Sequence, residues 1–198
     1  TPTATLSDNT LCAGESTVLT ASLIASGVAT VGAGGTTSST TAASFFPGSW
    51  GGAKTQYILK ASELTAAGLG AGAITSLGFD VTSVGQTYQG FRVQLGHTSA
   101  TAMTTTFLTD PLTQVYLGTL ADDGYLPTVG VNTLAFGTGA GSSSSFVWDG
   151  TSNIVISVCA QLATTGTAGT LRGVTTPFVS HIFNNATTTD CAATTGSS

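Results

Sequence analysis

The sequence predicts an all-β protein, a sandwich or a barrel, with one short helix and an extended segment in front of the main domain. Two observations carry this prediction. Short stretches in which apolar and polar residues alternate recur along most of the chain, and alternation is the period of a β-strand with one buried face. Turn-forming Gly, Asp and Asn separate these stretches, and many short strands with turn signals between them are typical of sandwiches and barrels.

The chain is expected to divide into an N-terminal extension, residues 1–24, and a β-sandwich domain, residues 25–198. In the extension, Ala4 and Leu6 alternate with polar residues in TATLSDNT, and a similar alternation follows in STVLTASL. Both patterns predict strands, and the turn-like stretch SDNTLCAGE separates them.

Residues 26–54 are rich in Gly, Ser and Thr and predict a long surface loop that contains Phe45, Phe46 and Trp50. Loops of this length are usually functional or are ordered by a partner. The three aromatic side chains therefore have two readings. Either they pack against the sandwich or a neighbouring subunit, which we favour, or they stack on a sugar.

From Thr55 onward the alternation predicts strands within residues 55–61, 73–84, 88–99, 113–120, 131–139, 145–161, 171–176 and 181–186. In the third of these stretches, Phe91, Val93 and Leu95 share one face, and Arg92 and Gln94 lie on the other.

The only helix is expected in SELTAAGLG, residues 62–70. Ser62 is of the residue type that caps a helix N-terminus, and Gly68 can end the helix in the left-handed conformation.

Charged residues make up only 7% of the chain and the net charge is −5, against about 25% charged residues in an average domain. Four cations cannot neutralise a run of phosphates, which argues against nucleic-acid binding. A weakly charged surface repels its neighbours weakly, and it fits either a Thr/Ser-rich secreted protein or a surface covered by copies of itself.

No apolar stretch has the length of a membrane span, and no motif predicts a cofactor.

Signatures of an enzyme are weak, and no catalytic residue is predicted. His97 is expected to be a hydrogen-bonded structural residue, because no carboxylate lies near it in the sequence. Asp122 and Asp123 fit a solvated turn better than a Ca²⁺ site, because adjacent acids point to different sides. Asp149, which precedes Gly150, is read as part of a turn.

Four spaced blocks carry a resemblance to a known family: YILKASELTAAGLGAGAITSLGFDV, YQGFRVQLGHTS, FVWDGTSNIVISVC and CAATTG. Together they resemble a jelly-roll-like β-sandwich module of secreted, cell-surface proteins of the Bacteroidota, over about residues 50–196. The resemblance implies a jelly-roll-like antiparallel β-sandwich, an extracellular location at the cell surface, association with type IX secretion, and a structural or adhesive role without catalysis.

The sequence departs from that family at both ends. One more strand usually follows the CAATTG block in the family, and this sequence stops before it. At the front, PTATLSDNTLCAGESTVLTAS resembles the first strands of a bacterial immunoglobulin-like domain without the rest of that domain. The comparison implies a sandwich with one open edge and one spare strand, and an open edge is a template for another strand.

We therefore expect a subunit of an extracellular filament or pilus-like polymer, in which residues 1–11 of one copy insert head-to-tail into the next copy. Ala4, Leu6 and Leu11 are the candidate intersubunit residues in this segment. Two alternatives stay open: residues 1–24 complete their own sandwich in cis, or the protein is a monomeric adhesin or glycan-binding module. The expected partners are copies of the chain itself and, for the adhesin, surface glycans.

The chain has three cysteines, and an odd count leaves one thiol without a partner in its own chain. Cys159 and Cys191 both lie in blocks that carry the resemblance, so the resemblance implies a disulfide between them. Cys12 would then be available to bond a neighbouring copy. A pairing of Cys12 with Cys191, or a buried free Cys12, stays open.

Overall fold

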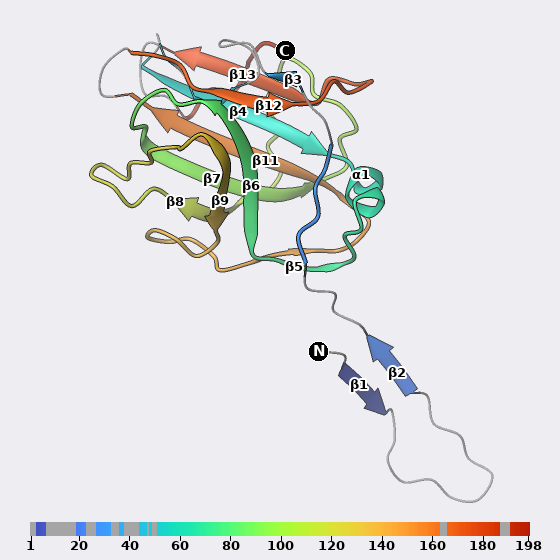
Figure 1. Ribbon diagram of the computed structural model, residues 1–198. Coiled ribbons are helices and arrows are strands. Elements are labelled where there is room, and N and C mark those ends of the chain that lie inside the picture. Colours follow the sequence, from blue (N-terminus) through green and yellow to red (C-terminus); the bar gives the residue numbers. More distant parts are fainter. Residues whose placement is uncertain are drawn as a thin grey trace, which may run out of the picture.

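A computed structural model describes residues 3–6, 19–22, 27–32, 36–37, 44–46, 48, 51–162, 166–186 and 191–198. It confirms the predicted all-β antiparallel sandwich with one short helix (Figure 1). The elements are β1 (Thr3–Leu6), β2 (Leu19–Ser22), β3 (Thr36–Thr37), β4 (Gly52–Leu59), α1 (Ala61–Ala66), β5 (Gly72–Ile74), β6 (Ser76–Ser83), β7 (Gln89–Thr98), β8 (Thr113–Leu117), β9 (Gly130–Ala135), β10 (Phe146–Trp148), β11 (Asn153–Gln161), β12 (Thr170–Gly173) and β13 (His181–Ala186).

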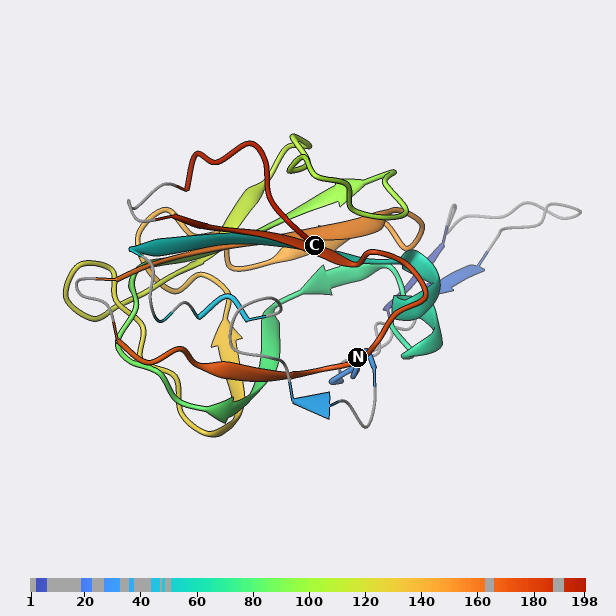
Figure 2. The ribbon, with the colours of Figure 1, turned by 90° about the horizontal axis from the view of Figure 1, so that it is seen from above.

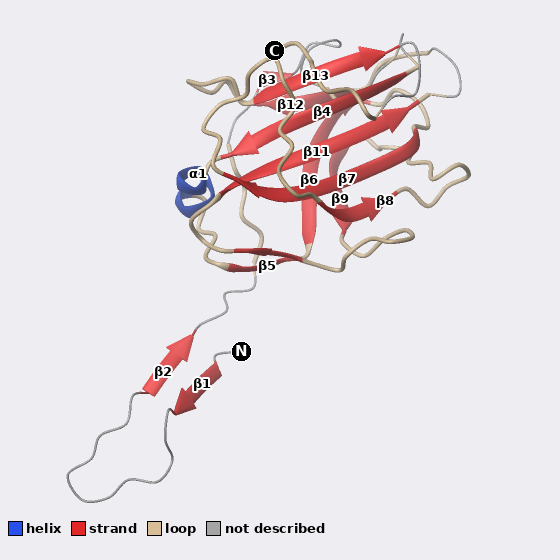
Figure 3. Ribbon diagram, turned by 180° about the vertical axis from the view of Figure 1, so that it is seen from behind, coloured by secondary structure: helices blue, strands red, loops and turns tan. Residues whose placement is uncertain are grey.

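Two open sheets form the sandwich. The first sheet has the strand order β13-β4-β11-β7-β8, and the second sheet has the order β3-β12-β6-β9 (Figure 3). From β3 to β13 the chain passes back and forth between the sheets, with β7 and β8 as the one consecutive pair that stays in the same sheet. The short strands β5 and β10 pair with each other at one end. Such repeated crossing is a feature of jelly-roll topologies.

The inner core lies between the two sheets and is rich in aromatic side chains. Phe46, Phe91 and Trp148 are all but fully buried, and the Phe46 ring stacks on the Phe91 ring at 5.8 Å between centroids. The favoured reading, packing of Phe45 and Phe46 against the sandwich, is confirmed, although these two residues lie in the core rather than in a surface loop. Burial of two large apolar side chains stabilises this arrangement.

A second core covers the outer face of the first sheet, which the alternation along β7 marks as polar. Ile58, Val155 and Ile182 lie on that face and are buried against Met103 and Phe107. The cover consists of residues 99–112 and residues 191–198, which we call the covering layer (Figure 2). β11 is therefore buried on both faces, at every position from Ile154 to Ala160.

Helix α1 begins earlier than predicted. Lys60, rather than Ser62, is its N-cap, and the Lys60 N–H donates to the Glu63 carboxylate at 2.8 Å. The Ala61 N–H at the helix start donates to the Asn153 side chain at 2.8 Å. The C-terminus agrees with the prediction, because Gly68 has a φ of 89° and the glycine-ended cap satisfies the last carbonyls.

The fit of the covering layer predicts the effect of Gly96→Ala. A Cβ at Gly96 would collide with the Pro111 carbonyl oxygen, part of the covering layer. We expect a loss of about 1–3 kcal/mol in the free energy of unfolding, measured by urea denaturation. Gly173→Ala is the matched control, because its Cβ would meet no atom within 4 Å. Equal stability of the two variants would contradict the close approach.

The buried tyrosines predict an alkaline limit to stability. Burial raises the pKa of Tyr88 and of Tyr125 to about 12, and a coulombic effect of Tyr116 adds to the rise at Tyr125. Since the folded pKa exceeds the unfolded value of 10.0, this stabilisation is complete below pH 10 and is lost as the pH rises toward 12.

Ultraviolet absorbance of tyrosinate, followed together with circular dichroism, measures this limit. We expect tyrosinate to appear above pH 10 together with loss of the sandwich. Tyr88→Phe should lose less stability than the wild type over the same pH range, because it lacks one of the groups whose ionisation drives unfolding. Full ionisation near pH 10 of an intact sandwich would contradict the burial.

Candidate intersubunit site

The N-terminal strand does not join the sandwich in this structure. β1 pairs antiparallel with β2, with Ala4 opposite Ala21 and Leu6 opposite Leu19. Neither strand belongs to the first or the second sheet, and Figure 1 shows the pair lying apart from both. The described part of the extension therefore does not complete its own sandwich. Leu11 and Cys12 lie outside the described residues.

The C-terminal segment lies against β13, the outermost strand of the first sheet. Phe183 and Ser197 exchange two backbone hydrogen bonds, of 2.9 and 2.8 Å. Asn184 donates from its side chain to the Thr195 carbonyl at 2.9 Å. The segment thus begins on the outer face of the sheet, where Cys191 is bonded to Cys159, and ends at this edge with Ser197; it forms half of the covering layer.

A disulfide joins Cys159 and Cys191, as the resemblance implied. Cys159 lies on the outer face of β11, between Lys54 and Arg92 on the neighbouring strands. The bond fixes the start of the C-terminal segment to the central strand. The Lys54 ammonium adds a second attachment, because it donates to the Ala193 carbonyl at 2.7 Å.

Of the three aromatic candidates, the structure describes two, Phe45 and Phe46. Phe45 and Phe46 are buried in the inner core, so neither side chain is placed to meet a sugar. Trp50 lies outside the described residues.

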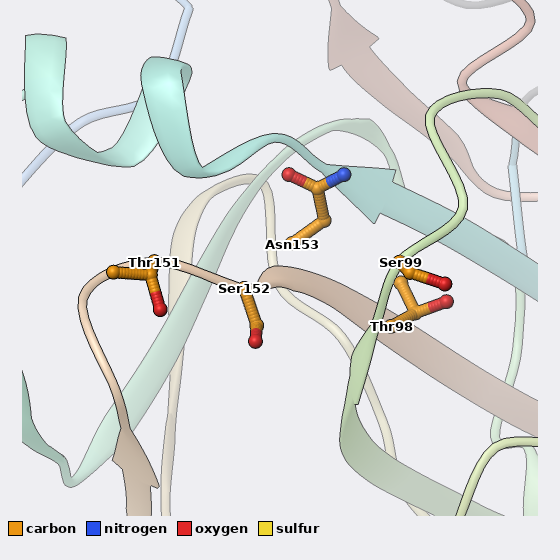
Figure 4. A pocket seen from close by; sticks show the side chains of 5 residues that line it. All are labelled: Thr98, Ser99, Thr151, Ser152 and Asn153. Atoms are coloured by element: carbon orange, nitrogen blue, oxygen red, sulfur yellow. The ribbon is translucent and has the colours of Figure 1, made fainter.

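A shallow polar pocket of about 300 Å³ lies where β7 ends and β11 begins. Figure 4 shows the five side chains that line it, which are Thr98, Ser99, Thr151, Ser152 and Asn153. Most of their polar groups are already used. Asn153 accepts from the Ala61 N–H and donates to the Ala100 carbonyl, and Thr98 donates to Asp110 at 2.9 Å. The pocket therefore joins the helix, the covering layer and β11.

Asp149 stands at the rim of this end of the sandwich, in the turn predicted for it. The Ser152 hydroxyl first, and then the Ser152 and Thr151 backbone N–H groups, hold the pKa of the Asp149 carboxyl well below its usual range. His97 lowers it slightly further. The hydrogen bond expected at His97 is absent from Nε2, which is buried without a partner among the described residues. The imidazole instead packs beside the Phe146 ring, with 4.8 Å between the ring centroids.

Asp122 and Asp123 form a tight turn in which both have positive φ, 56° and 53°. Their carbonyl oxygens accept the N–H groups of Gly90 and Phe91 at the start of β7. The Asp122 carboxylate accepts from the Gln89 side chain at 3.0 Å. The turn thus extends the pairing of β7. The two carbonyl oxygens and the Asp122 carboxylate already accept hydrogen bonds from residues 89–91.

The exposed apolar residues near β9 were not predicted from the sequence. Leu126, Val129 and Val131 are 51%, 69% and 74% exposed, and they occur within a stretch without charge from residue 124 to residue 148. A count of charge along the sequence would have marked this stretch, since uncharged strands are poorly protected against pairing with other chains.

Among the described residues, no helix is long and apolar enough to cross a membrane.

Comparison of the chain with protein-family models, with curated proteins and with solved structures gave no match.

The disulfide predicts a specific loss of stability. Replacing Cys159 and Cys191 together by serine should lower the free energy of unfolding by about 2–4 kcal/mol, because the unfolded chain loses a cross-link. The measurement is urea denaturation, and Cys12→Ser is the matched control, expected to unfold like the wild type. If reductant left the wild-type transition unchanged, the structural contribution of the bond would be refuted.

Proposed function

We propose that the protein is a non-catalytic structural subunit of an extracellular, cell-surface filament, in which the N-terminal strand of one copy pairs with the sandwich of the next. The observation that carries the proposal is the position of β1, which pairs with β2 alone and belongs to neither sheet. An isolated two-stranded hairpin is marginally stable in water. β1 can therefore exchange β2 for a sheet edge of another copy at little cost.

The composition supports repeated contact between copies. With 7% charged residues and 41% hydrophobic residues, approaching subunits meet little electrostatic repulsion. A head-to-tail contact that does not close on itself produces a filament rather than a ring. Burying each medium-sized apolar side chain in the contact contributes about 1.5–3 kcal/mol, so a few such residues make a long-lived joint.

The location at the cell surface rests on the resemblance to secreted Bacteroidota modules and on the disulfide. Disulfides persist mainly in oxidising environments outside the cytosol. In this proposal Cys12, which follows the donated strand in the sequence, forms a covalent link between neighbouring copies.

A single substitution in the donated strand tests the proposal. Leu6→Asp would place a charge in the buried joint, so we expect loss of polymer in negative-stain images and a monomer by light scattering. Leu6→Ile is the matched control and should assemble like the wild type. Deletion of residues 1–11 should have the same effect as Leu6→Asp.

Non-reducing electrophoresis of the same samples tests whether Cys12 forms disulfides between copies. Such bonds give a ladder of bands that collapses with reductant. Assembly of Leu6→Asp or of the deletion variant at the wild-type level would refute strand donation by this segment.

A further inference from the structure

We propose that the outer edge of β9 is the acceptor for the donated N-terminal strand of a second copy. This inference rests on the proposed function and adds the place where the strand docks. It follows from the state of the four sheet edges, from the backbone groups that β9 presents, and from the absence of charge on both strands.

Three of the four edges of the sandwich are unsuited to accept a strand. The outer side of β8 is covered by residues 137–143, through hydrogen bonds such as Leu117 N–H to the Thr138 carbonyl at 2.9 Å. β13 meets the C-terminal segment at Ser197. β3 consists of two residues only, Thr36–Thr37, and very short edge strands are poor templates.

β9 forms the fourth edge and is six residues long. Phe136 N–H donates to the Thr75 carbonyl, and in the same antiparallel register Leu134 and Asn132 face their partners on β6. Backbone groups alternate in direction along a strand, so those of Val131 and Thr133 point away from β6. No hydrogen bond to these outward groups occurs among the described residues.

Side chains beside this edge favour an apolar occupant. Val131 is 74% exposed on β9, and Val129 is exposed directly before it. Leu126 is kept near the same strand, because its neighbour Tyr125 and Thr128 both donate to the Asn132 side chain. Exposed valines beside open backbone groups are the features that strand addition uses.

The occupant is a second copy of this chain, because both strands lack charge. Residues 124–148, which include β9, carry no charged residue, and neither do residues 1–7, which include β1. A charged partner strand would leave its charges desolvated against this edge. β1 forms a strand over Thr3–Leu6, which is short enough to pair along β9 without overhang.

Edge-directed variants of the full chain test the proposal by sedimentation and negative-stain imaging. Val131→Lys adds a charge at the edge, and Thr133→Pro removes an outward N–H that pairing with β6 does not use. We expect each to lower the sedimented fraction about tenfold or more, the change that about 1.4 kcal/mol produces. Val147→Lys, at another exposed valine on β10, is the matched control and should assemble normally.

Hydrogen exchange supplies a readout that does not depend on how well the variants fold. The outward backbone amides of Val131 and Thr133 should exchange at least about tenfold more slowly in the wild-type polymer than in monomeric Leu6→Asp protein. Unchanged exchange of these two amides, or full assembly of both Val131→Lys and Thr133→Pro, overturns β9 as the acceptor. If Leu6→Asp fails to assemble in the same series, strand donation still stands. Assembly of Leu6→Asp, or a wild type that stays monomeric, overturns both proposals.

Discussion

The double burial of β11 is the constraint on which the rest of the structure depends. This strand lies in the centre of the first sheet between β4 and β7, and its residues from Ile154 to Ala160 are buried on both faces. One face contributes to the inner core and the other to the core beneath the covering layer. The disulfide at Cys159 attaches the C-terminal segment to the same strand. Both cores and the disulfide therefore depend on the nine residues of β11.

The covering layer has to provide hydrogen bonds as well as apolar contacts. Gln56 is 1% exposed, and its side-chain amide both donates to and accepts from the Leu108 backbone, at 3.2 and 2.8 Å. A buried amide without such partners would destabilise the fold. The loop is therefore held over the sheet in a defined register, because only one position of Leu108 satisfies both groups.

The strands were predicted from the alternation of apolar and polar residues. Each stretch predicted from Thr55 onward overlaps a strand of the structure. The second core was not predicted, because alternation along Arg92 and Gln94 marks a polar outer face. The run IVISVCA on β11 carried the missing signal, since continuous apolar strands are typical of burial on both faces. The start of α1 at Ala61 is held by Asn153, which is distant in the sequence. The disulfide could be anticipated only through the resemblance.

The pairing order of the strands determines how late in synthesis the sandwich can close. β4 finds its two sheet neighbours in Asn153–Gln161 and His181–Ala186, and β3 finds its neighbour in Thr170–Gly173. Non-local pairing of this kind is slow and leaves strand edges exposed until it is complete. A chain emerging N-terminus first would therefore remain open and threadable until its last strands are released.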